Sequence, residues 1–435
     1  MDVDRLTSTE STHARGDKEA VEASGAVAND VSHEPLAASW RAEPLSAAET
    51  SKVVQILEAC RDHDLPALAA LATSDGGLVE DEIRRIAWPL LLGCGDGGGS
   101  TSQPSWQTLP AHRDEHQVEL DVNRSFIYYP KGESETQIDS RKQQLSNVIT
   151  EVLRRHPLLC YFQGYHDIVQ VLLLVLGAEK AVDAVAHLSL LRIRDFMLPS
   201  LSAAISHLQL LPAIMYAADA ELCKHLSQTM KQPFFALAAT LTMYAHDIQE
   251  YGDIARLFDF LLAREAVFSV YLFAVVITSR KKDLLSIPPT EPETLHSILS
   301  SLPRPLDLDP LLARTTPLFA QHPPASLPFR AWSRISRHSV LKTTRDAARL
   351  ARLSLQDGEA LFRRQAAEME RVEAWERRRG WVRAFARRYR REVVGVGGAV
   401  LVALVAVWLG SGGVERVVGE GVAGIVRWVG GAVGE

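Results

Sequence analysis

Apolar residues recur about every 3.6 positions over much of the chain, a spacing that predicts helices. Ser46 and Glu49 have the spacing of a helix capping box, and Val53, Ile56 and Leu57 follow at helical intervals. The same period recurs at 81–93, 138–154, 165–177, 181–197, 203–227, 232–244 and 253–279. Because no segment alternates apolar and polar residues between hairpin turns, the predicted fold class is all-α.

The remaining segments differ in composition. Residues 1–45 are rich in Ala, Ser, Glu and Thr, with too few large apolar side chains to offset the entropy of ordering, so we expect a disordered arm. We expect irregular loops at 93–104, which is glycine-rich, and at 283–328, which is proline-rich. The predicted domain therefore covers 46–340, and a charged, Arg-rich linker helix is expected over 341–392.

Three apolar runs are candidates for membrane spans. The runs 168–176 and 266–278 are well short of the roughly 20 residues that cross a bilayer, which favours buried core helices. Residues 393–413 carry no charge and follow an arginine-rich, aromatic segment, so they predict a transmembrane anchor with the arginines on the cytosolic side. The tail 414–435 would lie at the membrane interface or dip back into the membrane, and Arg427 argues against a second full span.

Composition narrows the classes of protein. The chain has 435 residues and is 47% hydrophobic, as expected of a folded protein. Its net charge of -6 argues against nucleic acid as a partner. The four cysteines are widely spaced without a CxxC pair, which favours reduced thiols and the cytosol. The polar N-terminus carries no apolar stretch typical of a secretory signal.

The first candidate for chemistry is a carboxylate close to a guanidinium. Asp121 precedes Arg124 by about one helical turn, so the carboxylate can hold the guanidinium in a fixed pose. About forty residues later, Gln163 supplies an amide. An arginine can neutralise charge on a transferring phosphate, and a glutamine can orient the attacking water. The two together are what a protein needs to complete a partner's phosphoryl-transfer site.

Two segments fit a nucleotide-binding sequence pattern but lack the structural context that the pattern requires. Residues 93–98 and 419–424 both fit GxGxxG, but neither follows a strand within a βαβ unit. The sequence contains no GxxxxGK[ST] motif. We therefore expect neither dinucleotide binding nor nucleotide hydrolysis by the chain itself.

Two histidine arrangements also have ordinary interpretations. His112 and His116, with Asp114 between them, have a spacing that can place two imidazoles on one metal, but the local sequence offers no third ligand and no HExxH glutamate. A surface histidine pair is favoured, and no metal is predicted. His166 and Asp167 are adjacent and would point to different faces of a helix, which favours packing or capping over general-base chemistry.

Three ordered motifs resemble the signature motifs of TBC domains, the GTPase-activating proteins of Rab GTPases. They are the run 84–93, the pair Asp121 and Arg124, and Tyr161-x-Gln163-Gly164. The runs 112–125 and 161–169 are similar to the branch of this family that is anchored in the endoplasmic reticulum, whose members also end in a membrane segment. Residues 194–197 and 256–260 resemble later helices of the domain, so the resemblance spans about 78–280.

The resemblance implies a mechanism with two finger residues. Arg124 would enter the nucleotide site of the Rab protein and neutralise charge developing between the β- and γ-phosphates, while Asp121 would hold Arg124 through a paired hydrogen bond. Gln163 would orient the hydrolytic water. Tyr161 would pack so as to set the position of Gln163.

The resemblance also implies a fold, partners and a location. The fold would be a multi-helix TBC-type domain with a C-terminal membrane-anchor helix, in which Arg84 and Trp88 have structural roles. The chain would need no cofactor of its own, because the partner, a Rab-family GTPase in its GTP form, carries GTP and Mg²⁺. It would be a GTPase activator and not itself a hydrolase, acting in vesicle-mediated transport between endoplasmic reticulum and Golgi from the endoplasmic reticulum membrane.

One departure and two other hypotheses accompany this interpretation. Met243 stands where the family often has tryptophan, which changes the packing near the Rab-facing surface. A catalytically inactive, membrane-tethered Rab-binding scaffold is the main alternative, and the presence of both Arg124 and Gln163 counts against it. A metal-dependent lipid or phosphate hydrolase would instead use the cluster His112, Asp114 and His116.

Overall fold

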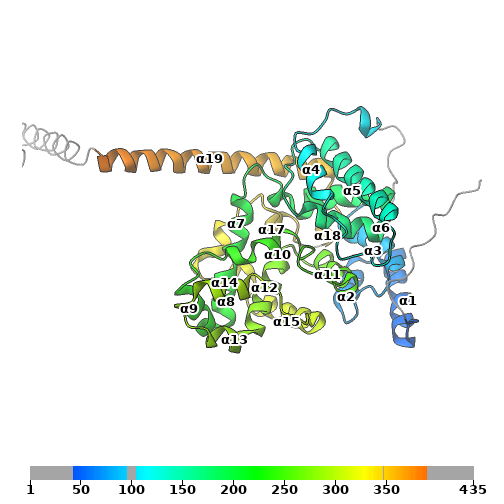
Figure 1. The fold of residues 1–435 in the computed structure, drawn as a ribbon, viewed down its shortest axis with the longest axis horizontal. Coiled ribbons are helices and arrows are strands. Elements are labelled where there is room, and N and C mark those ends of the chain that lie inside the picture. Colours follow the sequence, from blue (N-terminus) through cyan, green and yellow to red (C-terminus); the bar gives the residue numbers. More distant parts are fainter. Residues whose placement is uncertain (1–42, 96–103, 346, 389–435) are drawn as a thin grey trace, which may run out of the picture. The chain divides into compact units, whose positions relative to one another are not determined.

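A computed structural model describes residues 43–95, 104–345 and 347–388. These ranges contain helices and no β-strand, so the predicted all-α fold is confirmed for them. The helices, shown in Figure 1, are α1 (Ala47–Arg61), α2 (Leu65–Thr73), α3 (Asp81–Leu92), α4 (Glu115–Val122), α5 (Glu135–Arg155), α6 (Tyr165–His187), α7 (Ser202–Leu208), α8 (Leu211–Ala218), α9 (Ala220–Ser227), α10 (Leu237–Leu241), α11 (Tyr251–Ala263), α12 (Phe268–Ser279), α13 (Lys281–Ser286), α14 (Pro292–Leu299), α15 (Leu308–Gln321), α16 (Ala331–Arg334), α17 (Val340–Thr343), α18 (Ala347–Leu350) and α19 (Leu355–Arg388).

Short 3-10 or π-helical turns join several of these α-helices. They are η1 (Trp106–Thr108), η2 (Leu188–Arg192), η3 (Arg194–Phe196), η4 (Phe234–Ala236), η5 (Pro324–Ser326) and η6 (Pro328–Arg330). The segment 181–197, predicted as one helix, is therefore α-helical to His187, π-helical over η2, and ends in the 3-10 turn η3. Within α6 the backbone kinks at Gly177, whose φ of 75° is left-handed.

Local sequence explains how the first helices begin and end. Ser46 and Glu49 form the predicted capping box, in which the Ser46 hydroxyl accepts the Glu49 N–H and a Glu49 carboxylate oxygen accepts the Ser46 N–H. The helix α3 ends at Gly93, which adopts the left-handed conformation that terminates many helices.

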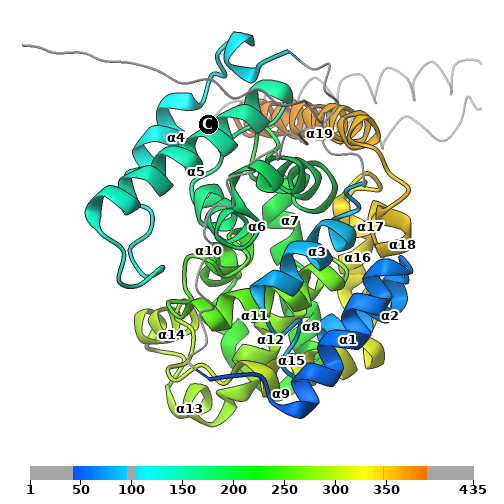
Figure 2. The same ribbon diagram turned by 90° about the vertical axis from the view of Figure 1, so that its right-hand side faces the viewer.

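The core is built around two apolar helices. In the views of Figures 1 and 2, α6 packs against α3 and α5, and α12 packs against α8 and α15. The apolar runs 168–176 and 266–278 lie in α6 and α12, where most of their side chains are buried, so the prediction of core helices is confirmed. Burial of many such side chains is the main favourable term for the fold.

One buried carboxylate joins α3 to α11. Asp259 accepts hydrogen bonds from Arg84 Nε (3.0 Å) and Nη2 (2.9 Å), from Trp88 Nε1 (2.8 Å) and from the Leu78 backbone N–H (2.9 Å). Arg84 also pairs with Asp81 at 2.9 Å. Since Arg84, Trp88 and Asp259 are almost fully buried, the pairing compensates charges that have lost their water. Nothing in the sequence around Asp259 predicts that it accepts hydrogen bonds from Arg84 and Trp88.

The expectation of irregular loops over 283–328 is wrong in part, because α14 and α15 lie within it. Pro292 opens α14, where a missing N–H removes no intrahelical bond, and Pro310 lies in the first turn of α15 for the same reason. Within the described segment 283–328, Pro317 is the proline that lies in a helix interior. Prolines near helix starts therefore marked boundaries rather than loops.

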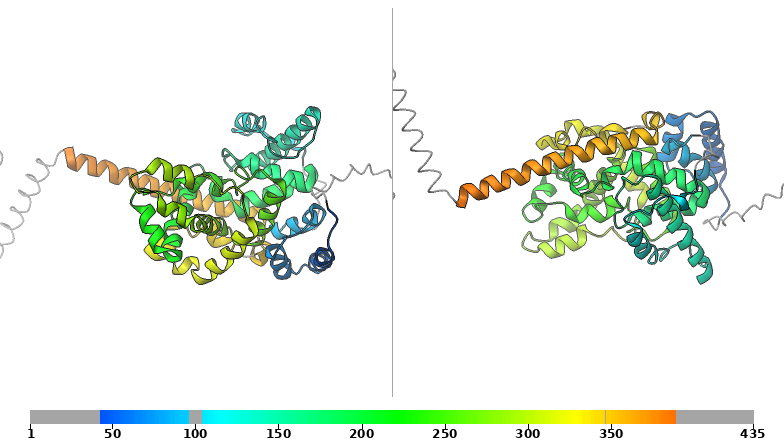
Figure 3. Two further views of the ribbon diagram at one scale, coloured as in Figure 1. Left: turned by 60° about the horizontal axis from the view of Figure 1, so that its bottom comes forward. Right: turned by 90° about the horizontal axis from the view of Figure 1, so that it is seen from above.

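The beginning of α19 packs against the domain (Figure 3). Gly358 lies so close to Leu190 that an added Cβ would be 2.9 Å from the Leu190 Cβ, and Glu359 pairs with His156 at 2.9 Å. Further along, Glu373 accepts a hydrogen bond from Ser200 Oγ at 2.9 Å. Much of the segment predicted as a linker is thus in contact with the domain.

The predicted anchor 393–413, the tail 414–435 and nearly all of the predicted arm 1–45 lie outside the described residues. Among the residues that are described, no helix combines the length and the apolar character needed to cross a membrane.

Candidate active site

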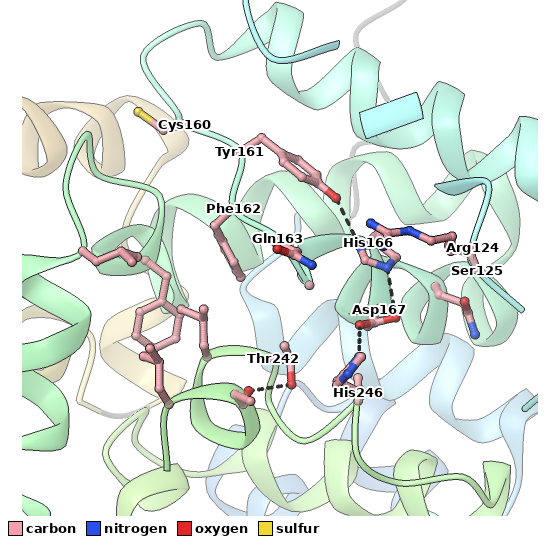
Figure 4. Close-up of a pocket in the computed structure, with 18 of the residues that line it drawn as sticks. Arg124, Ser125, Cys160, Tyr161, Phe162, Gln163, His166, Asp167, Thr242 and His246 are labelled. Atoms are coloured by element: carbon pink, nitrogen blue, oxygen red, sulfur yellow. Dashed lines mark hydrogen bonds and ion pairs between the residues drawn. The ribbon is translucent and has the colours of Figure 1, made fainter. Parts of the chain in front are cut away.

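A cavity of about 720 Å³ forms where four segments of the chain meet. It is lined by the loop after α4, by the turn that leads into α6 and the first turns of that helix, by the segment between η3 and α7, and by residues of α10 and the turns after it. Arg124 and Gln163 both line this cavity, which we call the finger cavity (Figure 4). The two candidate finger residues, far apart in the sequence, are therefore brought to one place.

Arg124 stands just beyond the end of α4 with an exposed side chain. Its Nη2 donates to Asp121 Oδ1 at 2.6 Å, and the side chain is 64% exposed whereas that of Asp121 is 0% exposed. The expected paired hydrogen bond is a single one, because Asp121 Oδ2 instead accepts the Tyr161 hydroxyl at 2.9 Å. Gln117 Nε2 donates to Oδ1 at 3.1 Å. A buried carboxylate needs such donors, and here they hold it in place beneath the arginine.

Tyr161 supports Arg124 through Asp121. Its hydroxyl donates to Asp121 and also lies 3.1 Å from His166 Nδ1, and its ring packs edge-on against Tyr165 with the centroids 5.9 Å apart. Burial and the nearby Asp121 carboxylate raise the pKa of Tyr161, so the hydroxyl keeps its proton and remains a donor. Tyr161 was predicted to set the position of Gln163. The partners of its hydroxyl are Asp121, which holds Arg124, and His166.

Gln163 is exposed in the turn before α6, and among the described residues its amide makes no hydrogen bond. The next residue, Gly164, has a φ of 97°, which side chains rarely allow, and an added Cβ would lie 2.5 Å from the Thr242 methyl group. Gly164 is thus required by both conformation and space. This buried glycine places an unbonded amide at the rim of the cavity.

The loop that carries Arg124 is fixed by a buried amide. Phe126 has a φ of 62° and its N–H donates to Gln170 Oε1 on α6 at 3.0 Å. Both residues are buried, so this bond ties the loop to α6. The only sequence signal for Gln170 was a polar residue within an apolar helix.

A chain of polar contacts continues from Tyr161 to the surface. His166 Nε2 lies 3.3 Å from Asp167 Oδ1, and Asp167 Oδ2 lies 3.0 Å from His246 Nδ1 (Figure 4). The expectation that His166 and Asp167 point apart is wrong, because they are at the first turn of α6 and converge there. Burial lowers the pKa of His166, whereas the hydrogen bond to Asp167 raises the pKa of His246.

The histidine pair 112 and 116 is not a surface pair. His112 is buried, with Nε2 3.0 Å from the Leu159 carbonyl oxygen and Nδ1 3.2 Å from the Asp114 N–H, so both ring nitrogens have partners. Asp114 Oδ2 accepts the Tyr161 N–H at 2.9 Å. His116 is exposed. His112 and Asp114 hold the segment that leads to Tyr161.

Comparison with known proteins identifies the family. The profile of the Rab-GTPase-TBC domain matches residues 81–285. TBC1 domain family member 20 of Bos taurus is 35% identical over 288 residues, which cover 65% of this chain and 70% of that protein. GTPase-activating protein gyp10 of Schizosaccharomyces pombe is 31% identical over 320 residues, covering 73% of this chain and 84% of that protein.

The fold has a solved counterpart as well. The crystal structure of the Ypt/Rab-GAP domain of Gyp1p superposes with a TM-score of 0.51 at 15% identity, covering 63% of this chain and 99% of that structure. The helical architecture and these relatives agree, and the chain belongs to the Rab-GTPase-TBC domain family.

Proposed function

We propose that this protein is a GTPase-activating protein for a Rab-family GTPase and that it supplies Arg124 and Gln163 to the partner's nucleotide site. One observation carries the proposal. Both side chains are exposed at the same cavity, while the groups that hold them, Asp121 and Gly164, are buried. A guanidinium and an amide presented in this way complete a phosphoryl-transfer site that another protein brings with its GTP and Mg²⁺.

The roles follow from the chemistry of each group. Arg124 would place positive charge and planar donors beside the phosphate oxygens on which charge accumulates during hydrolysis. The Gln163 amide can accept a hydrogen bond from the attacking water and donate another, which sets the direction of attack. Asp121 and Tyr161 are positioning residues, because they act through Arg124.

The test is single-turnover GTP hydrolysis by a panel of GTP-loaded Rab proteins, with the full-length chain in detergent as the added protein. We expect acceleration of one or a few Rab proteins, reduced by at least about 10²-fold in Gln163→Ala because the water is no longer aligned. Gln228→Ala, an exposed glutamine outside the cavity, is the matched control and should match the wild type.

A second outcome would replace the proposal by the scaffold hypothesis. If a Rab protein binds the chain in its GTP form and its hydrolysis is not accelerated, the protein recognises the GTPase without activating it. Equal acceleration by the wild type and Gln163→Ala would remove the glutamine from the mechanism.

We further propose that residues 393–413 anchor the protein in the endoplasmic reticulum membrane and that it acts in transport between endoplasmic reticulum and Golgi. The uncharged run and the preceding arginines support the anchor. Removal of residues 393–435 should release the protein from the membrane fraction into the supernatant after cell lysis. A truncated protein that sediments with membranes as the full chain does would contradict the anchor.

A further inference from the structure

A second cluster of reactive side chains lies apart from the finger cavity. Cys94 follows the end of α3, and Asp183 and His187 lie four residues apart on α6. One ligand atom from each, a sulfur, a carboxylate oxygen and a ring nitrogen, all lie within 4.8 Å of one another. No residue of this cluster lines the finger cavity, and its chemistry plays no part in the proposed activation of a GTPase.

We propose that Cys94, Asp183 and His187 form a binding site for a divalent zinc-type cation. Thiolate and imidazole are the donors that favour Zn²⁺ over the hard cations Mg²⁺ and Ca²⁺, and zinc accepts a carboxylate as a further ligand. Bond lengths of about 2.0–2.3 Å in a tetrahedron place ligand atoms about 3.5 Å apart, so ligand atoms that now lie up to 4.8 Å apart would approach one another by up to about 1.3 Å. The side chain of Asp183 is 56% exposed and has room to move.

The backbone already holds the three side chains near one another. A helix presents residues i and i+4 on one face, which sets Asp183 and His187 side by side. Gly93, just before Cys94, is left-handed, and an added Cβ would meet the Ala351 Cα at 3.1 Å. Cys94 is thus held where α3 ends. His187 Nδ1 already contacts Asp183, lying 3.0 Å from its backbone carbonyl oxygen and 3.3 Å from its Oδ1.

The site is open on one side. A cavity of about 680 Å³ is lined by Cys94 and Asp183, together with Cys60, Glu179 and other residues. Three protein ligands and an accessible fourth position are the arrangement in which zinc retains a water molecule. Binding would release the Cys94 thiol proton to solvent, so affinity should rise with pH. The bound ion would tie the end of α3, the helix that carries Arg84, to α6.

The experiment is titration of the full-length chain in detergent with Co²⁺, which takes zinc sites and reports a thiolate ligand by its charge-transfer absorption. We expect one Co²⁺ per chain, the thiolate band, and displacement of the cobalt by added Zn²⁺. Cys94→Ser should abolish the band, and Asp183→Asn should weaken binding at least about tenfold. Asp183 is exposed, so the second variant is expected to fold normally.

Cys60→Ser is the matched control, because Cys60 lines the same cavity outside the cluster. It should retain the band and the affinity. Absence of a thiolate band in the folded wild type would overturn the proposal. So would a band of equal intensity in Cys94→Ser, which would place the metal on another cysteine.

Discussion

Arg124→Ala is expected to lower the stimulated rate of Rab GTP hydrolysis by about 10³- to 10⁵-fold, or roughly 4–7 kcal/mol of activation free energy. The guanidinium is the exposed cation of the finger cavity that the buried Asp121 holds in place. Alanine removes the charge and the donors from the phosphate oxygens. Single-turnover hydrolysis with the Rab protein found to respond to the wild type measures the loss.

Two further variants make this result specific. Arg124→Lys retains the charge but lacks the planar set of donors, so it should recover only a small part of the rate. Arg61→Ala, at the end of α1, removes an exposed arginine that pairs with Asp62 outside the cavity and should behave as the wild type. Retention of the full rate by Arg124→Ala, with binding unchanged, would contradict the arginine's role as a finger.

Asp259→Asn is expected to lower the free energy of unfolding by about 3–5 kcal/mol. The substitution keeps the shape of the side chain and removes its charge. Arg84, 1% exposed, would then be a buried cation with Asp81 as its remaining charged partner. An amide NH₂ also cannot accept the hydrogen bonds that both carboxylate oxygens now receive from Arg84, Trp88 and Leu78.

Thermal unfolding of the full-length chain measures this effect, and a midpoint lower by about 10 °C is expected. Asp253→Asn is the matched control on the same helix. Burial raises the pKa of Asp253, so loss of its charge should leave stability unchanged or slightly higher. A midpoint for Asp259→Asn within a degree of the wild type would show that the buried pair is not required for stability.

Features that depend on neighbours in the sequence were predicted well. The capping box at Ser46 and the approach of Asp121 to Arg124 follow from spacing along a helix. The burial of runs 168–176 and 266–278 follows from their apolar character and short length. Predictions failed at the starts of helices, where rules that hold for the interior of a helix or for a loop do not apply. His166 and Asp167 converge at a helix start, and prolines counted as loop residues instead open α14 and lie in the first turn of α15.

The sequence by itself determined the helical class, most helix positions, the family and the residues proposed as fingers, because each of these leaves a periodic pattern or a short motif. Only the tertiary structure decided which distant residues support them. Asp259 pairs with Arg84 across 175 positions, and Gln170 holds the Phe126 N–H across 44. Such contacts depend on how whole helices pack, so they cannot be predicted from the spacing of residues along the sequence.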